Sequence, residues 1–273
     1  MTINIGGNIM NFHKPKIMGI LNVTPDSFYD GGFFNSQKKV LSQVNKMIRD
    51  GVDIIDIGGY SSKPGAQDIS VETELKRVIP QIKAIKKNFE DIPISIDTFR
   101  SKVAKEAVSY GAEIINDISS GDLDKKMFET VSNLNVPYIM MHMLGKPINM
   151  QKNPIYKNVV IDIIKNLSKK IHRARKKGIN DIIIDPGFGF GKTINDNYIL
   201  LKNLSFFKEL GCPILVGVSR KSMIYKVLNS NPENSLNGTT CLNTISLMNG
   251  ANILRVHDVK QAKEVVSLVE SLN

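Results

Sequence analysis

Eight short apolar runs, rich in Ile and Val, recur along the 273-residue chain and constrain its fold more than any other feature. Runs that are apolar throughout are typical of parallel strands buried on both faces. Most segments between them are long enough to hold a crossover helix. The pattern predicts an α/β protein of the (β/α)8 or TIM-barrel class, with its active site at the carboxyl ends of the strands. The runs are Ile17–Leu21, Ile54–Ile57, Ile94–Ile96, Ile114–Ile115, Tyr138–Met141, Ile182–Ile184, Ile214–Val218 and Ile253–Leu254.

The length fits a single domain over residues 1–273, because such barrels take about 250 residues. Residues 2–12 carry two strand-like pieces around Gly6-Gly7-Asn8, which is a hairpin signal. We expect residues 1–14 to form an N-terminal β-hairpin that covers the bottom of the barrel. Residues 15–273 would then form the barrel itself.

The formal net charge of +10 invites a nucleic-acid-binding interpretation. Lysine is in excess over the whole chain, however, and Asn and Ile are also abundant, which indicates a bias of composition. We therefore expect no nucleic-acid partner, although the charge can attract an anionic substrate. A basic nucleic-acid-binding module is the alternative from another functional class, and a salt-dependent gel shift would support it.

The chain shows no signal for a membrane or for secretion. No apolar stretch approaches the roughly 18 residues that a membrane helix needs, and the N-terminus lacks a secretory apolar run. Cys212 and Cys241 have no CxxC spacing, so we expect buried thiols rather than a disulfide or a zinc site. These features predict a cytoplasmic protein.

Polar side chains follow several of the predicted strands. Asp97 and Asp185 each come directly after a run, while Asn116 and Lys221 follow two others. A lone carboxylate in such a place is often a helix cap, which is the alternative for Asp97. Together the four would offer donors and acceptors to a flat heterocycle at the barrel mouth. A guanidine-like edge of that heterocycle would pair with Asp185.

An anion site is predicted nearby. Arg255 and His257 follow the last run two residues apart, and Asn22 follows the first. Asn22 could also bind Mg²⁺, which prefers oxygen ligands and is often shared with substrate phosphates. Ser222 stands where a helix is expected to begin, and free amides at such a start bind carboxylate or phosphate. His142, as a lone histidine, is expected to be structural.

The segment Gly187–Thr193 looks like a phosphate-binding P-loop but does not match one. That motif needs a glycine five positions before Gly191, where this chain has Pro186. The glycines more plausibly allow a sharp turn over the barrel mouth. Phe190 is then either a platform for a ligand or a core aromatic.

In combination, the motifs closely resemble those of the dihydropteroate synthase family, from about residue 15 to the C-terminus. They are Leu21-Asn-Val-Thr-Pro-Asp-Ser-Phe28, Ile96-Asp-Thr98, Ile115-Asn-Asp117, Met141-His-Met143, Asp185-Pro-Gly-Phe-Gly-Phe-Gly-Lys192, Gly217-Val-Ser-Arg-Lys-Ser222 and Arg255-Val-His-Asp258. The resemblance implies a pterin-binding TIM barrel, a transferase of folate biosynthesis that sulfonamides target. It implies Mg²⁺ dependence and a homodimer. The implied substrates are 6-hydroxymethyl-7,8-dihydropterin diphosphate and 4-aminobenzoate, which give 7,8-dihydropteroate and diphosphate.

The resemblance also implies roles for individual residues. The catalytic set would be Lys221, Arg255, Asp97 and Asp185, and with Asn116 these would bind the pterin. Diphosphate would be bound by Asn22, Ser62, Lys63, Arg255 and His257, with Asn22 as the Mg²⁺ ligand. Aminobenzoate would be bound by Phe28, Ser62, Lys63, Pro64, Phe190 and Ser222.

The chain departs from the family pattern Gly-Gly-Glu-Ser-Thr-Arg-Pro-Gly after the second run. It has Tyr60 for Glu, Ser62 for Thr and Lys63 for Arg. The departures bear on efficiency and sulfonamide affinity more than on the reaction. The closest alternative enzyme is a pterin-binding methyltransferase barrel with a corrinoid partner, and product analysis with aminobenzoate would distinguish the two.

Overall fold

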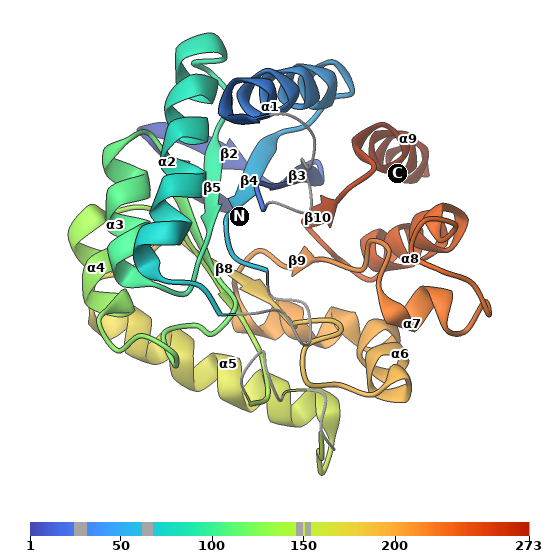
Figure 1. Cartoon of the computed structure of the whole chain (residues 1–273). Coiled ribbons are helices and arrows are strands. Elements are labelled where there is room, and N and C mark those ends of the chain that lie inside the picture. The colour runs from blue at the N-terminus through green and yellow to red at the C-terminus, as the bar shows by residue number, and fades with distance from the viewer. Residues whose placement is uncertain (25–31, 62–67, 146–149, 151–153, 273) are drawn as a thin grey trace.

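The computed structural model describes residues 1–24, 32–61, 68–145, 150 and 154–272, with only the backbone given for residues 32–36. Within these residues, eight parallel strands form the barrel that the apolar runs predict, and helices surround it (Figure 1). Four residues with expected roles, Phe28, Ser62, Lys63 and Pro64, lie outside the described residues. The strands are β3 (Lys16–Asn22), β4 (Ile54–Gly58), β5 (Ile94–Asp97), β6 (Ile114–Asp117), β7 (Tyr138–Met141), β8 (Ile182–Asp185), β9 (Leu215–Val216) and β10 (Ile253–Val256).

The strand register brings the polar strand ends to one level. The strands pair in the order β8-β7-β6-β5-β4-β3-β10-β9, and a bridge between Ile184 and Ile214 nearly closes the barrel. Asn22 lies opposite Gly58, Gly58 opposite Asp97, and Asp97 opposite Asn116. The register therefore places Asn22, Asp97 and Asn116 along one rim.

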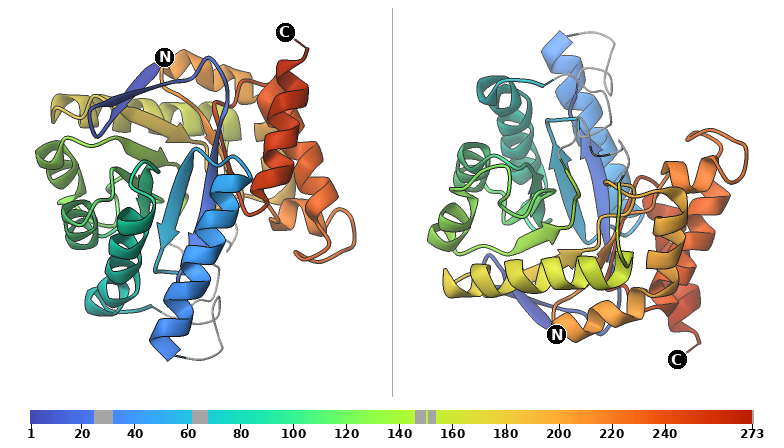
Figure 2. Two further views of the ribbon diagram at one scale, coloured as in Figure 1. Left: turned by 90° about the horizontal axis from the view of Figure 1, so that it is seen from above. Right: turned by 90° about the horizontal axis from the view of Figure 1, so that it is seen from below.

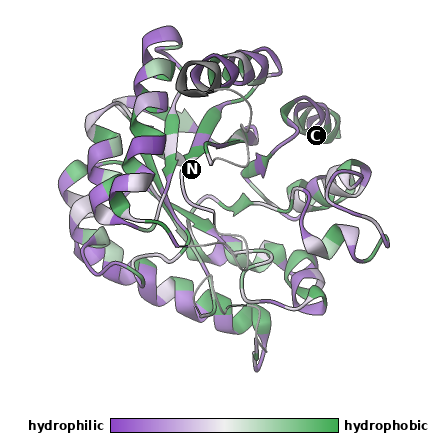
Figure 3. Cartoon of the chain, viewed as in Figure 1, coloured by the Kyte–Doolittle hydropathy of each residue, from purple (hydrophilic) through white to green (hydrophobic). Residues whose placement is uncertain are grey.

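The helices pack their apolar sides on the barrel. Green, hydrophobic residues therefore lie mainly on the strands, and purple, hydrophilic residues lie on the outer sides of the helices (Figure 3). Ser70 caps α2 as expected, because its side chain accepts a hydrogen bond of 3.1 Å from the backbone of Thr73. The helices are α1 (Gly32–Arg49), α2 (Val71–Asn88), α3 (Ser101–Ser109), α4 (Met127–Leu134), α5 (Val159–Lys176), α6 (Ile194–Lys202), α7 (Ser222–Tyr225), α8 (Leu236–Met248) and α9 (Val259–Glu270), with a 3₁₀ helix, η2 (Leu204–Leu210). In the part of the chain described, none of them is long and apolar enough to span a membrane.

The prediction that both cysteines are buried is confirmed for one and wrong for the other. Cys212 is buried, but Cys241 is exposed on α8. Both are free thiols, as expected. The criterion used, the absence of CxxC spacing, does not report burial: Cys212 lies just before the run Ile214–Val218, whereas Cys241 lies inside α8.

The N-terminal hairpin covers the bottom of the barrel, as predicted. Its strands, β1 (Thr2–Ile5) and β2 (Asn8–Asn11), lie across one end of the molecule (Figure 2). Ile3, Ile5 and Phe12 are buried there in one cluster. They pack against residues at or near the starts of the strands, which are Met18, Ile54, Ile114, Ile139, Ile183, Leu215 and Ile253.

Truncating the buried side of this hairpin is expected to destabilise the protein. Ile5 is 3% exposed, whereas Ile9 on the opposite strand is 64% exposed. Ile5→Ala should lower the free energy of unfolding by about 2–5 kcal/mol, the usual cost of a large-to-small core substitution. Ile9→Ala is the matched control and should change it by less than about 0.5 kcal/mol. Equal effects in urea denaturation would show that the hairpin does not seal the core.

Candidate active site

Arg255 joins three strands at the barrel mouth. Its Nε donates to Asp56 Oδ2 at 2.7 Å, and one terminal nitrogen donates to Asp97 Oδ2 at 2.6 Å. The three residues come from β10, β4 and β5. Burial acts to lower the pKa of Arg255, but the carboxylates of Asp56 and Asp97 more than reverse this effect, so the guanidinium stays charged. The structure thus confirms that Arg255 and Asp97 lie together.

Sequence reasoning missed Asp56. It stands inside the run Ile54–Ile57, which the pattern predicts to be an apolar strand, and its side chain is fully buried. Its Oδ2 accepts from Arg255 and also from Asn116 Nδ2 at 3.0 Å. Its Oδ1 has no hydrogen-bond partner among the described residues. The available signal was the charge itself, because an ionised side chain in a buried strand needs a partner.

Asp185 and Lys221 occupy the other side of the mouth. Asp185 is 6% exposed, and its Oδ1 accepts from the backbone N–H of Gly187 at 2.7 Å. Burial raises the pKa of Asp185, while the nearby Lys221 opposes the shift. Burial lowers the pKa of Lys221 to about 8. The two groups therefore influence each other across the site.

Lys221 also lies near Arg255 and Phe190. Its Nζ donates to Phe188 O and lies 4.7 Å from the centre of the Phe190 ring. A Cβ added to Gly217 would lie 3.8 Å from Arg255 Cβ and 3.9 Å from Lys221 Nζ, so both side chains flank that glycine. Phe190 is only half buried. Its position favours the ligand-platform interpretation over a core aromatic.

Lys192 holds the glycine-rich segment through hydrogen bonds to its backbone. Its Nζ is buried and donates to Gly187 O at 2.8 Å and Phe190 O at 3.1 Å, with His142 Nδ1 at 3.2 Å. Burial and the Lys192 charge lower the pKa of His142 to about 2, so its imidazole is neutral and can accept this hydrogen bond. These contacts support the structural role expected for His142. Gly187 has a φ of +74°, and a Cβ there would lie 1.9 Å from His142 O, so only glycine fits.

His257 and Ser222 lie at the edge of the same face. His257 is exposed, and its Nδ1 is 3.0 Å from Ser219 Oγ. The neighbouring Arg220 is held by Asp258 through two bonds of 2.8 and 2.9 Å. Ser222 begins α7, as expected, but this helix has only four residues. An anion would therefore be bound by the backbone amides at the start of α7, and not by the dipole of a long helix.

Asn22 is the oxygen ligand expected for Mg²⁺. A Cβ on Gly58 would lie 3.4 Å from Asn22 Oδ1 and 3.8 Å from Asp97 Oδ2, so the two side chains flank Gly58. Among the described residues, no group of three His, Cys, Asp or Glu side chains could hold a metal ion. This donor set fits a cation that the protein holds through one amide oxygen and that the phosphates of a ligand complete.

Comparison with known proteins agrees with the motifs. Residues 18–257 match the family model described as "Pterin binding enzyme". The dihydropteroate synthase of Escherichia coli K12 is 44% identical over 97% of this chain and 94% of its own length. The structure of Yersinia pestis dihydropteroate synthase with a sulfonamide drug complex is 40% identical, with a TM-score of 0.93 over 100% of this chain and 98% of that one. Xanthomonas albilineans dihydropteroate synthase in complex with 7,8-dihydropteroate is 34% identical, with a TM-score of 0.90 over the same shares.

The stability contribution of Asp97 should depend on pH. Burial raises its pKa to about 7, because Arg255 only partly compensates and Asp56 repels it. The ordinary value in the unfolded chain is about 3.9, so between these values the folded state alone holds the proton. Protonated Asp97 therefore contributes to the stability of the folded state, fully below about pH 4, and this contribution is lost as the pH rises through about 7.

Denaturation of Asp97→Asn and the wild type across this pH range tests the shift. The stability of Asp97→Asn relative to the wild type should increase between about pH 4 and 7. The exposed Asp91 supplies the control, Asp91→Asn. A constant difference for Asp97→Asn would show that its pKa is not raised.

Proposed function

The chain belongs to the pterin binding enzyme family, and we propose that its barrel mouth condenses 6-hydroxymethyl-7,8-dihydropterin diphosphate with 4-aminobenzoate. The products are 7,8-dihydropteroate and diphosphate. The observation that carries the proposal is a set of five side chains at one end of the barrel, two of them buried (Asn116, Asp185) and three half-buried (Asp97, Lys221, Arg255). Relatives of matching fold, one of them with 7,8-dihydropteroate bound, support it.

The pterin would lie among these five side chains. Asp185 supplies a buried carboxylate for the guanidine edge of the ring, and Asn116 supplies an amide. Lys221 donates to a ring oxygen or nitrogen, and Arg255 lies against the ring face. Asp56 takes no part in the expected set but holds Arg255 and Asn116 through one shared oxygen. Groups held in this way are positioned before the ligand arrives, which lowers the cost of binding.

The reaction needs charge stabilisation and positioning more than a protein nucleophile. The bond between the pterin methylene carbon and the diphosphate oxygen breaks, and its electron pair leaves with diphosphate. The carbon is left as a cation that the ring and the carboxylates of Asp97 and Asp185 stabilise. The aryl amine attacks this carbon and then loses a proton. Arg255 and His257, with Asn22, Ser62 and Lys63, would bind the departing diphosphate.

Mg²⁺ would be held by Asn22 Oδ1 together with the substrate phosphates. The chemistry it supplies when bound is neutralisation of charge on the leaving diphosphate. The position of Asn22 beside Gly58 at the rim supports this assignment.

Aminobenzoate would bind next to the pterin methylene. Phe190 lies beside Lys221 and can contact the aryl ring. Ser222 and the amides at the start of α7 would receive the carboxylate. Phe28, Ser62, Lys63 and Pro64 complete the expected set and remain proposals, since they lie outside the described residues.

Analysis of product and of pterin binding tests the function. With both substrates and Mg²⁺, the wild type should form 7,8-dihydropteroate, identified by mass spectrometry. Asp185→Asn should weaken pterin binding by about 2–5 kcal/mol in calorimetry, because it leaves buried donors without their anion. Asp181→Asn, at the other end of β8, is the matched control. No product from the wild type, or unchanged pterin affinity in Asp185→Asn, would contradict the proposal.

A homodimer is supported by exposed apolar side chains on consecutive elements. Phe206 is 56% exposed and Met248 66%, and α7 packs against both α6 and α8. Exposed large apolar side chains on neighbouring elements can form such an interface. The full set is Ile199, Phe206, Val227, Leu228, Ile245 and Met248. The cytoplasmic location expected from the sequence stays a prediction.

Light scattering after size-exclusion chromatography tests the dimer. The wild type should have twice the mass of the chain, and Met248→Lys should shift it toward the monomer because it places a charge in the interface. Ile155→Lys, at an 82% exposed site outside this set, is the control. A monomeric wild type would contradict the dimer.

A further inference from the structure

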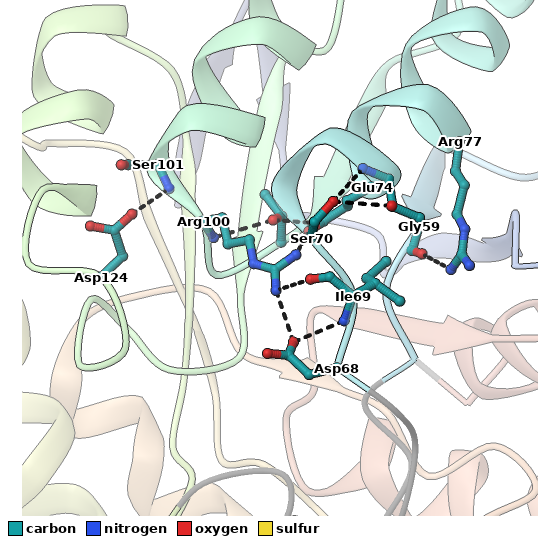
Figure 4. Close-up of polar contacts among 11 residues, drawn as sticks. Gly59, Asp68, Ile69, Ser70, Glu74, Arg77, Arg100, Ser101 and Asp124 are labelled. Atoms are coloured by element: carbon teal, nitrogen blue, oxygen red, sulfur yellow. Dashed lines mark hydrogen bonds and ion pairs between the residues drawn. The ribbon is translucent and has the colours of Figure 1, made fainter.

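Glu74 on α2 is a buried carboxylate that the proposed reaction does not use. Its side chain has no exposed surface. Its Oε1 accepts a hydrogen bond of 2.7 Å from Thr98 Oγ1. Its Oε2 accepts one of 2.8 Å from Arg100 Nη1 (Figure 4). Both donors follow β5, so Glu74 holds the chain directly beyond that strand.

The charge of Glu74 is balanced by that of Arg100. Burial raises the pKa of Glu74, while the hydrogen bond from Thr98 and the charge of Arg100 oppose the rise. The other terminal nitrogen of Arg100 donates to Asp68 Oδ1 at 2.9 Å and to Ile69 O at 2.6 Å (Figure 4). The guanidinium therefore fastens the start of α2 to the segment that follows β5.

Thr98 connects Glu74 with two residues of the proposed pterin set. Its hydroxyl donates to Glu74 and accepts from the backbone N–H of Arg100 at 3.2 Å. Its own backbone N–H donates to Asn116 O at 2.9 Å. Asp97 is its direct neighbour in the chain. Thr98 is 2% exposed, so these bonds lie inside the protein.

The same part of α2 also packs on the end of β4, which pairs with β5. A Cβ on Gly59 would lie 2.6 Å from Val78 Cγ1 and 3.3 Å from Glu74 Cγ, so the helix lies directly against the backbone there. Arg77, one turn after Glu74, donates to Gly59 O at 2.9 Å (Figure 4). This face of α2 therefore contacts the ends of both strands whose acids bind the guanidinium at the barrel mouth.

The position of Asp97 depends on these contacts because β5 ends at that residue. Beyond it, the backbone bond to Asn116 and the bond between Thr98 and Glu74 hold the chain. Asp97 must keep its carboxylate 2.6 Å from Arg255 and still face the pterin. A binding group keeps such a geometry only when the residues behind it are themselves held in place.

We propose that Glu74 is a positioning residue for the pterin: through the hydroxyl of Thr98 it fixes the strand end from which Asp97 reaches the ring. The inference rests on the proposed function. Glu74 is enclosed by protein and acts only through the groups that it binds. Loss of its bond to Thr98 should therefore weaken pterin binding although no side chain of the pterin set is changed.

Calorimetry with 6-hydroxymethylpterin on Thr98 variants of the full chain tests the inference. Thr98→Val keeps the shape of the side chain but removes the donor to a buried carboxylate, and it should weaken pterin binding about tenfold or more. Thr98→Ser keeps the hydroxyl and should stay within about threefold of the wild type.

Ile5→Ala is the control for a loss of stability alone. It lies at the opposite end of the barrel, where it is expected to destabilise the protein, and distant sites act independently. Its pterin affinity should remain within about threefold of that of the wild type.

A second variant keeps the test decisive if Thr98→Val does not fold. Glu74→Met with Arg100→Met replaces the ion pair by apolar side chains, an exchange that is often neutral for folding. It removes the acceptor of Thr98, so pterin binding should again fall about tenfold or more. Unchanged pterin affinity in either folded variant, or an equal loss in Thr98→Ser, would overturn the role of Glu74. A wild type that does not bind pterin would instead refute the proposed function, and the inference with it.

Discussion

The guanidinium of Arg255, shared between Asp56 and Asp97, is the interaction on which the barrel mouth depends. It connects β10 with β4 and β5 through bonds of 2.7 and 2.6 Å, and Asp56 also holds Asn116. Removing one partner of a buried ion pair commonly costs about 3–5 kcal/mol, because the other charge is left uncompensated. Above the raised pKa of Asp97, about 7, the two carboxylates sharing one cation leave a net negative charge, which would stabilise a cationic reaction centre beside it.

The two proposed substrate sites are built from different parts of the barrel. The side chains proposed for the pterin stand at the ends of strands, where the barrel fixes their backbone. The residues expected at aminobenzoate lie mainly in connections, which need their own supports. Lys192 supports one of these, because it donates to the carbonyls of Gly187 and Phe190. The Lys192 side chain is itself buried among these acceptors.

The sequence predicted the barrel because buried parallel strands are continuously apolar and end in conspicuous polar residues. The same logic found Asp97, Asn116, Asp185, Lys221 and Arg255, since each follows a run. It missed Asp56, because a residue inside a run was taken to face the core. It could not find the contacts of Lys192, because most of its partners are backbone carbonyls. The spacing of Cys241 likewise gave no sign that it lies on the exposed side of α8.

A crystal structure with 6-hydroxymethylpterin bound would show directly whether the barrel mouth holds the pterin as proposed. The guanidine edge of the pterin should lie on Asp185, and Asn116 and Lys221 should contact the ring. Arg255 should lie against the ring face while it keeps its bonds to Asp56 and Asp97. A pterin bound elsewhere on the barrel, or an Arg255 displaced from Asp56 when the ligand is present, would contradict it.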